Sequence, residues 1–132
     1  MNAPQTIRNA FTVDVEDYFQ VSALAPYIAR ADWDGIECRV ERNVERILAL
    51  LDESGNRGTF FTLGWVAQRY PEMVKRIAAA GHEIASHGSA HLRATDQSPA
   101  EFLDDIARAK TLLEDITGVE VRGYRAPSFS IG

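Results

Sequence analysis

The chain has 132 residues, of which 45% are hydrophobic and 25% charged, a composition typical of a globular domain and not of a disordered segment. A formal net charge of −5, without any run rich in lysine and arginine, argues against a nucleic-acid partner. Residues 1–9 contain no apolar stretch of the kind found in signal peptides or membrane spans, and the single cysteine, Cys38, cannot form an internal disulfide. We therefore expect a cytoplasmic chain without a membrane span.

The first half of the sequence predicts two strands and a long helix. Residues 11–15 form a short apolar, β-branched run that ends abruptly in acidic residues, which is typical of a buried strand. From Val40 onward apolar residues recur at helical spacing, and Gly55 is placed to cap the end of that helix. Residues 58–63 predict a second buried strand, and residues 66–70 a helical turn.

The second half continues the alternation. Residues 71–81 predict a helix that begins with proline and ends with glycine, and residues 82–86 a third strand. The run Ser98–Glu101 has the serine, proline and glutamate of a capped helix start, and this long helix ends at Gly118. Residues 119–124 predict a fourth strand. Strands that alternate with helices indicate parallel pairing through right-handed crossovers, hence an α/β fold, either an open sheet or a (β/α) barrel.

Polar side chains follow three of the four predicted strands. Sites of α/β proteins lie on the loops at the carboxyl ends of parallel strands, which meet at one edge of the sheet. We therefore expect these side chains to lie close together. They are Asp14 near the end of the first strand, Glu16 and Asp17 directly after it, His87 and His91 after the third strand, and Arg125 after the fourth.

The histidine pair is a candidate metal site. His87 and His91 are four residues apart, so their rings would project from the same side of a helical turn, and imidazole is the commonest ligand for zinc-like metals. The alternative is two solvated loop histidines. His82 and Glu83 do not complete the H-E-x-x-H protease signature, because the next histidine is five residues after His82. Strand alternation points His82 away from His87, so we expect a structural role for it, paired through a ring nitrogen.

The acidic cluster has two interpretations. A buried carboxylate is costly unless a cation lies nearby, so Asp14, Glu16 and Asp17 are candidate partners of a metal or of a basic side chain. The alternative is an acidic turn exposed to solvent. Arg125 supplies a planar fork that could hold one of these carboxylates.

Three ordered motifs, TVDVED, SHGSAH and RAPSF, resemble those of the polysaccharide deacetylase family, also called the NodB homology domain. The run TFFTLGWVAQRYPEMVKRIAAAGHEIASH between the first two motifs is also similar, so the resemblance extends over nearly the whole chain. Within the family, the segment DVEDYF most resembles the bacterial branch associated with exosortase and exopolysaccharide gene clusters. The resemblance implies an α/β fold in which residues 1–132 form one partial domain, the first half of a distorted (β/α)7-type barrel.

The resemblance also implies a hydrolase that uses a divalent metal, with Zn²⁺ the expected ion, to remove N-acetyl groups from a polysaccharide containing N-acetylglucosamine (GlcNAc). Family members usually have adjacent aspartates in the first motif, whereas here Val15 follows Asp14. The expected ligands are therefore the two histidines of the second motif and Glu16, with Asp17 as the alternative to Glu16. One carboxylate with two imidazoles also suits iron, cobalt or nickel.

The same resemblance assigns the catalytic groups. Asp14 would be the base that takes a proton from water, Arg125 would orient Asp14 and keep it ionised, and the backbone N–H of Ser128 would stabilise the oxyanion. Family domains continue past the third motif to a Leu-x-His whose histidine acts as the general acid, whereas this sequence ends at Gly132. We therefore expect a partial sequence with exposed sheet edges, little turnover of its own, and a tendency to instability or to pairing with another chain.

Two other functions remain open at this point. One is an inactive saccharide- or metal-binding module, and the other is a hydrolase of a small linear or cyclic amide. Four aromatic residues could line a sugar-binding groove or belong to the core. They are Tyr18, Trp33, Trp65 and Phe129.

Overall fold

The computed structural model describes residues 5–131, which contain a parallel sheet of three strands in the order β1-β2-β3. These strands are β1 (Thr12–Val15), β2 (Thr59–Thr62) and β3 (Glu83–Ser86). Their registers are aligned, because Val15 pairs with Thr62 and Thr62 pairs with Ser86. The residues that follow β1 and β3 therefore leave the sheet at the same edge.

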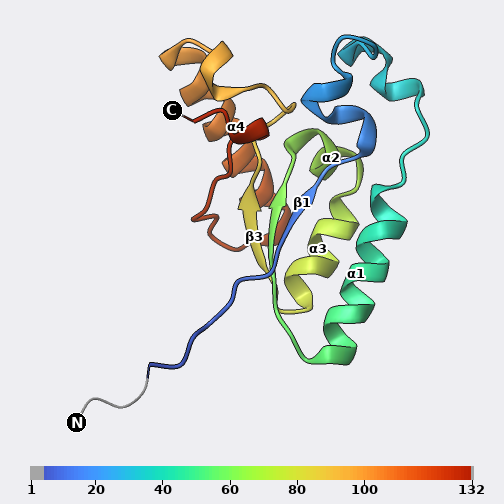
Figure 1. Ribbon diagram of the computed structural model, residues 1–132, viewed down its shortest axis with the longest axis vertical. Helices are drawn as coiled ribbons and strands as arrows, with labels where there is room; N and C mark the ends of the chain where they lie inside the picture. Colours follow the sequence, from blue (N-terminus) through green and yellow to red (C-terminus); the bar gives the residue numbers. More distant parts are fainter. Residues whose placement is uncertain (1–4, 132) are drawn as a thin grey trace.

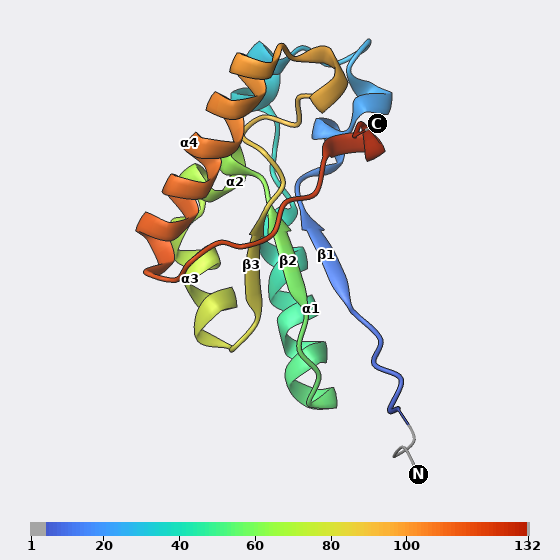
Figure 2. The same ribbon diagram turned by 90° about the vertical axis from the view of Figure 1, so that its left-hand side faces the viewer.

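Four α-helices accompany the strands and pack against one face of the sheet (Figures 1 and 2). Helix α3 contacts both α1 and α4, and the short α2 packs against α3 and α4. Strand alternation explains the layering, since Val15, Phe60 and Ile84 are buried in the core that the sheet shares with these helices. The helices are α1 (Val40–Ser54), α2 (Gly64–Arg69), α3 (Pro71–Ala79) and α4 (Pro99–Thr117).

The predicted elements are confirmed with small changes at their ends, apart from the fourth strand. Helix α1 ends where expected, with Gly55 in the left-handed conformation at φ 69°. Helix α4 begins with the predicted capping box, in which Ser98 and Glu101 each accept a hydrogen bond from the other's backbone N–H. Within residues 5–131, no helix combines the length and apolarity needed to cross a membrane.

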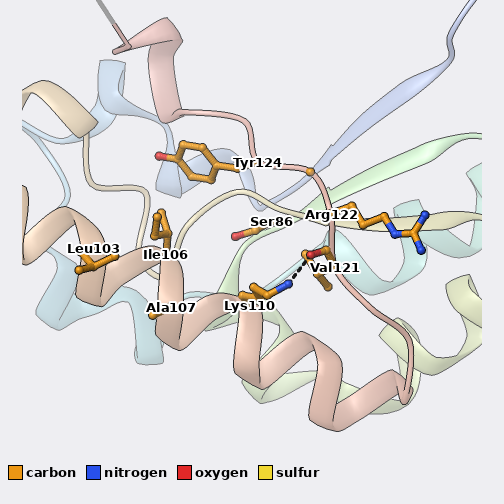
Figure 3. Close-up of a pocket in the computed structure, with 9 residues that line it drawn as sticks. Ser86, Leu103, Ile106, Ala107, Lys110, Val121, Arg122 and Tyr124 are labelled. Carbon is orange, nitrogen blue, oxygen red and sulfur yellow. Dashed lines mark hydrogen bonds between the residues drawn. The ribbon is translucent and has the colours of Figure 1, made fainter.

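The prediction of a strand at residues 119–124 is wrong. The segment runs parallel to β3 but pairs with it through one isolated bridge, between Ser86 and Tyr124. Helix α4 binds both backbone groups of Val121. Lys110 Nζ donates to the Val121 carbonyl at 2.7 Å (Figure 3), and the Val121 N–H donates to Glu114 at 2.9 Å. Those groups are then not available for a ladder.

Residues 16–39 form an excursion of three short 3-10 helices, which the periodicity did not predict. It includes η1 (Tyr18–Gln20) and η3 (Arg30–Gly35), with η2 (Ser22–Leu24) between them. The excursion packs through its aromatic residues, since the rings of Phe19, Trp33 and Trp65 meet edge to face with centroids 5.5–6.0 Å apart. Trp33 therefore belongs to the packed interior, and the half-buried Trp65 lies against it.

Candidate metal centre

Side chains from two strand ends meet at the edge of the sheet where the carboxyl ends of the strands lie. Glu16 follows β1 directly, and His87 follows β3. Glu16 Oε2 lies 3.3 Å from His87 Nε2 and 3.0 Å from His91 Nε2, and one donor atom of each residue lies within 4.8 Å of the others. Both histidines are buried. The expectation that these strand ends converge is confirmed, and the alternative of solvated histidines is not.

The donor set fits a divalent metal. Two donors of a tetrahedral zinc ion are about 3.3–3.6 Å apart when the bonds are about 2.0–2.2 Å long, and Glu16 lies at 3.3 and 3.0 Å from the two rings, close to that separation. Glu16 Oε2 is buried and makes no hydrogen bond of good geometry within the described residues, although two imidazole nitrogens face it. A cation at this point would satisfy a carboxylate oxygen that is otherwise without a partner.

The electrostatics of the cluster follow from its geometry. Burial acts to raise the pKa of Glu16, but the contacts with His87 and His91 outweigh burial and lower that pKa to about 2. Burial acts in the opposite sense on His87, where the contact with Glu16 and a bond to the Arg125 carbonyl prevail and raise the pKa. Carboxylate and imidazole therefore favour each other's charged forms.

His87 is oriented by a second contact. Its Nδ1 lies 2.8 Å from the main-chain oxygen of Arg125, and a carbonyl oxygen can only accept, so Nδ1 carries the proton. In the neutral ring Nε2 then has a free lone pair directed at Glu16. The Nδ1 atom of His91 is buried and has no partner among the residues described.

The loop between the two histidines is not the helical turn that their spacing predicts. Gly88 has φ 79° and His91 has φ 55°, so the chain bends twice through the left-handed region and the rings converge from a turn. The start of α2 holds this turn, because the N–H groups of Gly64 and Trp65 donate to the carbonyls of Gly88 and Ser89, each at 2.8 Å.

Arg30 in η3 binds the last part of the same loop. Its Nε donates to the Ala90 carbonyl at 3.0 Å and its Nη2 donates to the His91 carbonyl at 3.3 Å. A single planar guanidinium thus spans the two carbonyls around the strained residue that bears the second imidazole. Sequence reasoning did not single out Arg30, and its position in an irregular segment gave no signal.

Asp14 and Arg125 form an ion pair beside the three candidate ligands. Arg125 Nη1 donates to Asp14 Oδ1 at 2.7 Å, and its Nη2 donates to the Thr12 hydroxyl at 3.1 Å. The guanidinium also lies over the ring of Phe61, 4.0 Å from its centroid. Asp14 Oδ2 lies 4.0 Å from His87 Nε2, so this second oxygen is on the side of the histidines. The prediction that Arg125 holds one of the carboxylates is confirmed.

Asp17, the alternative to Glu16, is engaged elsewhere. Its Oδ2 accepts hydrogen bonds from the backbone N–H groups of Arg39 at 2.6 Å and Val40 at 2.9 Å, and its Oδ1 accepts from Tyr18. Asp17 therefore satisfies N–H groups at the start of α1 and caps η1. The structure brings Glu16 to the histidines and does not bring Asp17.

Ser128 lies at the rim of the same hollow. It belongs to η5 (Pro127–Phe129), where Ser128 and Phe129 both have φ 54°, and its hydroxyl donates to the Ser22 hydroxyl at 2.6 Å. The side chain of Phe129 is 93% exposed. The hollow has a volume of about 180 Å³, and its lining includes Asp14, Glu16, His87, His91, Arg125 and Ser128.

A larger hollow of about 370 Å³ lies between α4 and residues 121–124 (Figure 3). Its exposed lining is mostly apolar, and Lys110, its one lysine, is bound to the Val121 carbonyl and to Glu114. We therefore assign the chemistry to the smaller hollow, which has the carboxylates and imidazoles.

His82 has the structural role expected for it. Its Nδ1 accepts a hydrogen bond from the Gly58 backbone N–H at 3.0 Å, and the ring is buried at the opposite end of β3 from His87. Burial, together with the nearby charge of Arg57, lowers the pKa of His82.

Sequence reasoning missed Asp105, a buried acid on α4 that accepts a hydrogen bond from the Ser89 N–H at 3.0 Å. A signal was present, because Asp105 lies four and eight residues before Ala109 and Leu113 on the buried stripe of that helix. An acid on an apolar stripe marks a buried polar contact.

Comparisons with known proteins agree with this geometry. The sequence matches the family description Polysaccharide deacetylase over residues 33–131. A peptidoglycan-N-acetylglucosamine deacetylase of Bacillus cereus is 32% identical over 82 residues, which cover 62% of this chain and 30% of that protein. This chain spans about three tenths of the length of the curated relatives it matches.

Solved structures show the same fold. A protein from Mycobacterium smegmatis assigned as a polysaccharide deacetylase has 35% identity and a TM-score of 0.74, covering 96% of this chain and 47% of its own. A CE4 family pseudoenzyme from Bacillus anthracis has 26% identity and a TM-score of 0.68, covering 70% of this chain and 33% of its own. The family match extends over most of the chain and includes the histidine loop and the segment that bears Arg125. The chain belongs to the polysaccharide deacetylase family.

Proposed function

We propose that this chain is the metal-binding part of a hydrolase that removes N-acetyl groups from a polysaccharide containing GlcNAc. The convergence of Glu16, His87 and His91 beside the Asp14–Arg125 pair is the observation that carries the proposal. The Bacillus cereus relative, named for deacetylation of peptidoglycan GlcNAc, supports the substrate class. The resemblance of the segment DVEDYF to the branch associated with exopolysaccharide gene clusters supports an exopolysaccharide as a candidate substrate.

Glu16, His87 and His91 would hold the metal, with Zn²⁺ the expected ion. When bound, such a metal supplies Lewis acidity, which polarises an amide carbonyl and lowers the pKa of a water molecule. The protein's own part is to hold these donors at fixed separations. The bond from His87 Nδ1 to the Arg125 carbonyl serves that purpose.

Asp14 is the proposed base. Arg125 holds one of its oxygens and leaves the other on the side of the histidines, where it would take the proton from the attacking water. The backbone N–H of Ser128 is the proposed donor to the oxyanion, because the unusual backbone at Ser128 and Phe129 sits at the rim of this hollow. His82 is bound to Gly58, so no histidine of this chain is assigned to protonating the leaving amine.

One observation favours a second candidate function. Similarity to a protein described as a CE4 family pseudoenzyme favours a module that binds metal or saccharide without turnover. A small linear or cyclic amide is an alternative substrate for the same chemistry, because the proposed base and ligands act on the amide group and not on the sugar.

Metal analysis and acetate release test the proposal together. We expect close to one equivalent of bound metal in the purified parent and little in a His87→Ala, His91→Ala double variant. A His82→Gln variant serves as the matched control, because His82 lies away from the site. Equal metal content in the parent and the double variant would rule out the site.

Acetate release from chitooligosaccharides then separates the functions when it is assayed with a protein extended through the Leu-x-His motif of the family, because little turnover is expected of residues 1–132 alone. Release that stops in an Asp14→Asn variant with unchanged metal content supports the hydrolase. Bound metal without release from any glycan or small amide would support the binding module instead.

A further inference from the structure

Helix α4 buries a carboxylate on its apolar side. Asp105, Ala109 and Leu113 are its buried residues, and Asp105 is only 1% exposed. A buried ionised carboxylate is costly unless a cation or hydrogen-bond donors compensate for it. No ion pair involves Asp105 in the part of the chain that the structure describes, so its compensation comes from hydrogen bonds.

The compensating contact is with the loop that bears the histidines. Asp105 Oδ1 accepts the Ser89 backbone N–H at 3.0 Å, and the Ser89 hydroxyl donates to the main-chain oxygen of Asp105 at 3.1 Å. The fit is close, because a Cβ added at Gly88 would lie 3.2 Å from Asp105 Oδ2. Two hydrogen bonds thus fasten Ser89, midway between His87 and His91, to one turn of α4.

Apart from Ser89, the surroundings of Asp105 offer its carboxylate few hydrogen-bond partners. Within residues 5–131 its Oδ2 is buried without a hydrogen-bond partner, and so is the hydroxyl of Tyr124, a residue that also lies beside α4 (Figure 3). Burial raises the pKa of Tyr124, and the charge of Asp105 raises it further. Replacing Asp105 by leucine would leave the Ser89 N–H without its acceptor, which costs some stability. The contact with Ser89 is what such a replacement would remove.

We infer that Asp105 is a positioning residue for the candidate metal centre, fixing Ser89 and thereby the turn that directs His87 and His91 toward Glu16. The contact between Asp105 and Ser89 stands on its own, whereas its effect on metal affinity rests on the proposed function. Residues that orient metal ligands from outside the coordination sphere typically contribute 10–100-fold to metal affinity. The supports from α2 and Arg30 act on carbonyl groups of the loop, and Asp105 alone of the three accepts one of its N–H groups.

Cobalt titration of the 132-residue chain tests this inference, since the visible absorption of bound Co²⁺ reports the coordination geometry. We expect Asp105→Leu to bind Co²⁺ about 10–100-fold more weakly than the parent, with an altered spectrum. Asp105→Asn keeps an oxygen that can accept the Ser89 N–H, so it should restore the parental spectrum and most of the affinity. Leu113→Ala is the matched control, because it removes a buried side chain from the same stripe of α4 and should lower stability without changing Co²⁺ affinity.

Amide hydrogen exchange measured by NMR gives a second readout that needs no metal. We expect the Ser89 amide to be protected in the parent and in Asp105→Asn, and to exchange faster in Asp105→Leu. A Ser89 amide that exchanges freely in the parent would overturn the inference even if Asp105→Leu does not fold. An unchanged Co²⁺ affinity and spectrum in folded Asp105→Leu would overturn it as well. A parent that binds no Co²⁺ would refute the proposed metal site, while the exchange rates would still decide the role of Asp105 in the loop.

Discussion

Glu16 should control the acid stability of the metal-free chain. Burial acts to raise its pKa, but the contacts with His87 and His91 lower that pKa from 4.5 to about 2. A carboxyl group with a depressed pKa in the folded state stabilises the fold above its unfolded value, and this contribution is lost as the pH falls from about 4.5 toward 2. The difference of about 2.5 pH units, at about 1.4 kcal/mol each, corresponds to about 3.5 kcal/mol, of which about 3 kcal/mol is lost by about pH 2 because Glu16 is then only half protonated. The side chain is 16% exposed, so solvent screens this interaction only in part.

Thermal unfolding of chelator-treated protein from about pH 6 to about pH 2 measures this contribution. We expect the parent to lose about 3 kcal/mol more than Glu16→Gln over this range, or about 10 °C in Tm, because the amide has no proton to gain. Glu53→Gln is the matched control, since Glu53 is exposed on α1, and it should follow the parent. An equal loss of stability between about pH 6 and about pH 2 in the parent and in Glu16→Gln would refute the position of Glu16 between the rings.

At higher pH, His87 has the opposite effect on stability: its contribution is lost as the pH rises. Because the pKa of His87 is raised above 6.5, its protonated ring stabilises the metal-free fold below pH 6.5, and this stability is lost as the pH rises through the raised value. A metal needs the deprotonated ring, so added Zn²⁺ should move the stability maximum to higher pH. If added Zn²⁺ leaves the pH dependence of stability unchanged in this range, the proposed metal site is refuted.

Three further substitutions separate the site from the scaffold. Asp17→Ala removes the acceptor for N–H groups at the start of α1 and should cost about 1–2 kcal/mol in chemical denaturation, with Co²⁺ affinity unchanged. Gly64→Ala places a methyl group 3.1 Å from the Cα of Ser89, so the loop must shift, and Co²⁺ titration should show weaker binding; parental affinity would contradict this. His82→Leu leaves the Gly58 N–H without its acceptor and should lower the free energy of unfolding by about 1–3 kcal/mol, while metal content stays at the parental value.

The helices and three of the strands could be predicted because their signals are local. Helix α1 is encoded by the apolar periodicity from Val40 and by a glycine at its end, and α4 by a capping box whose two partners are three residues apart. The strand at 119–124 was predicted on the same kind of evidence and does not form. Its failure is tertiary, because Lys110 and Glu114 on α4 bind the backbone of Val121, and no pattern within 119–124 reports that contact.

The site was predicted in its chemistry and only partly in its geometry. Parallel strands with aligned ends place Glu16 and His87 together, and that rule needs no knowledge of the loops. The choice between Glu16 and Asp17 depends on the start of α1, 22 residues after Asp17, where two backbone N–H groups take its carboxylate. The backbone conformation between His87 and His91 could not be predicted from their spacing of four residues, because His91 has φ 55° and is not part of a helix.

The motifs contain the donor atoms, but segments outside the motifs direct them. The histidine loop is held by the first N–H groups of α2, by the guanidinium of Arg30 and by the carboxylate of Asp105. Each of these three contacts acts on the backbone of the loop, so none of them occupies the imidazole nitrogens that face Glu16. Arg30 lies before the matched region 33–131 and is exposed, whereas Asp105 lies within it and is buried. Breaking a buried polar contact costs more free energy than breaking an exposed one. Of these supporting residues, Asp105 is therefore the one whose substitution should most disturb the orientation of the histidines.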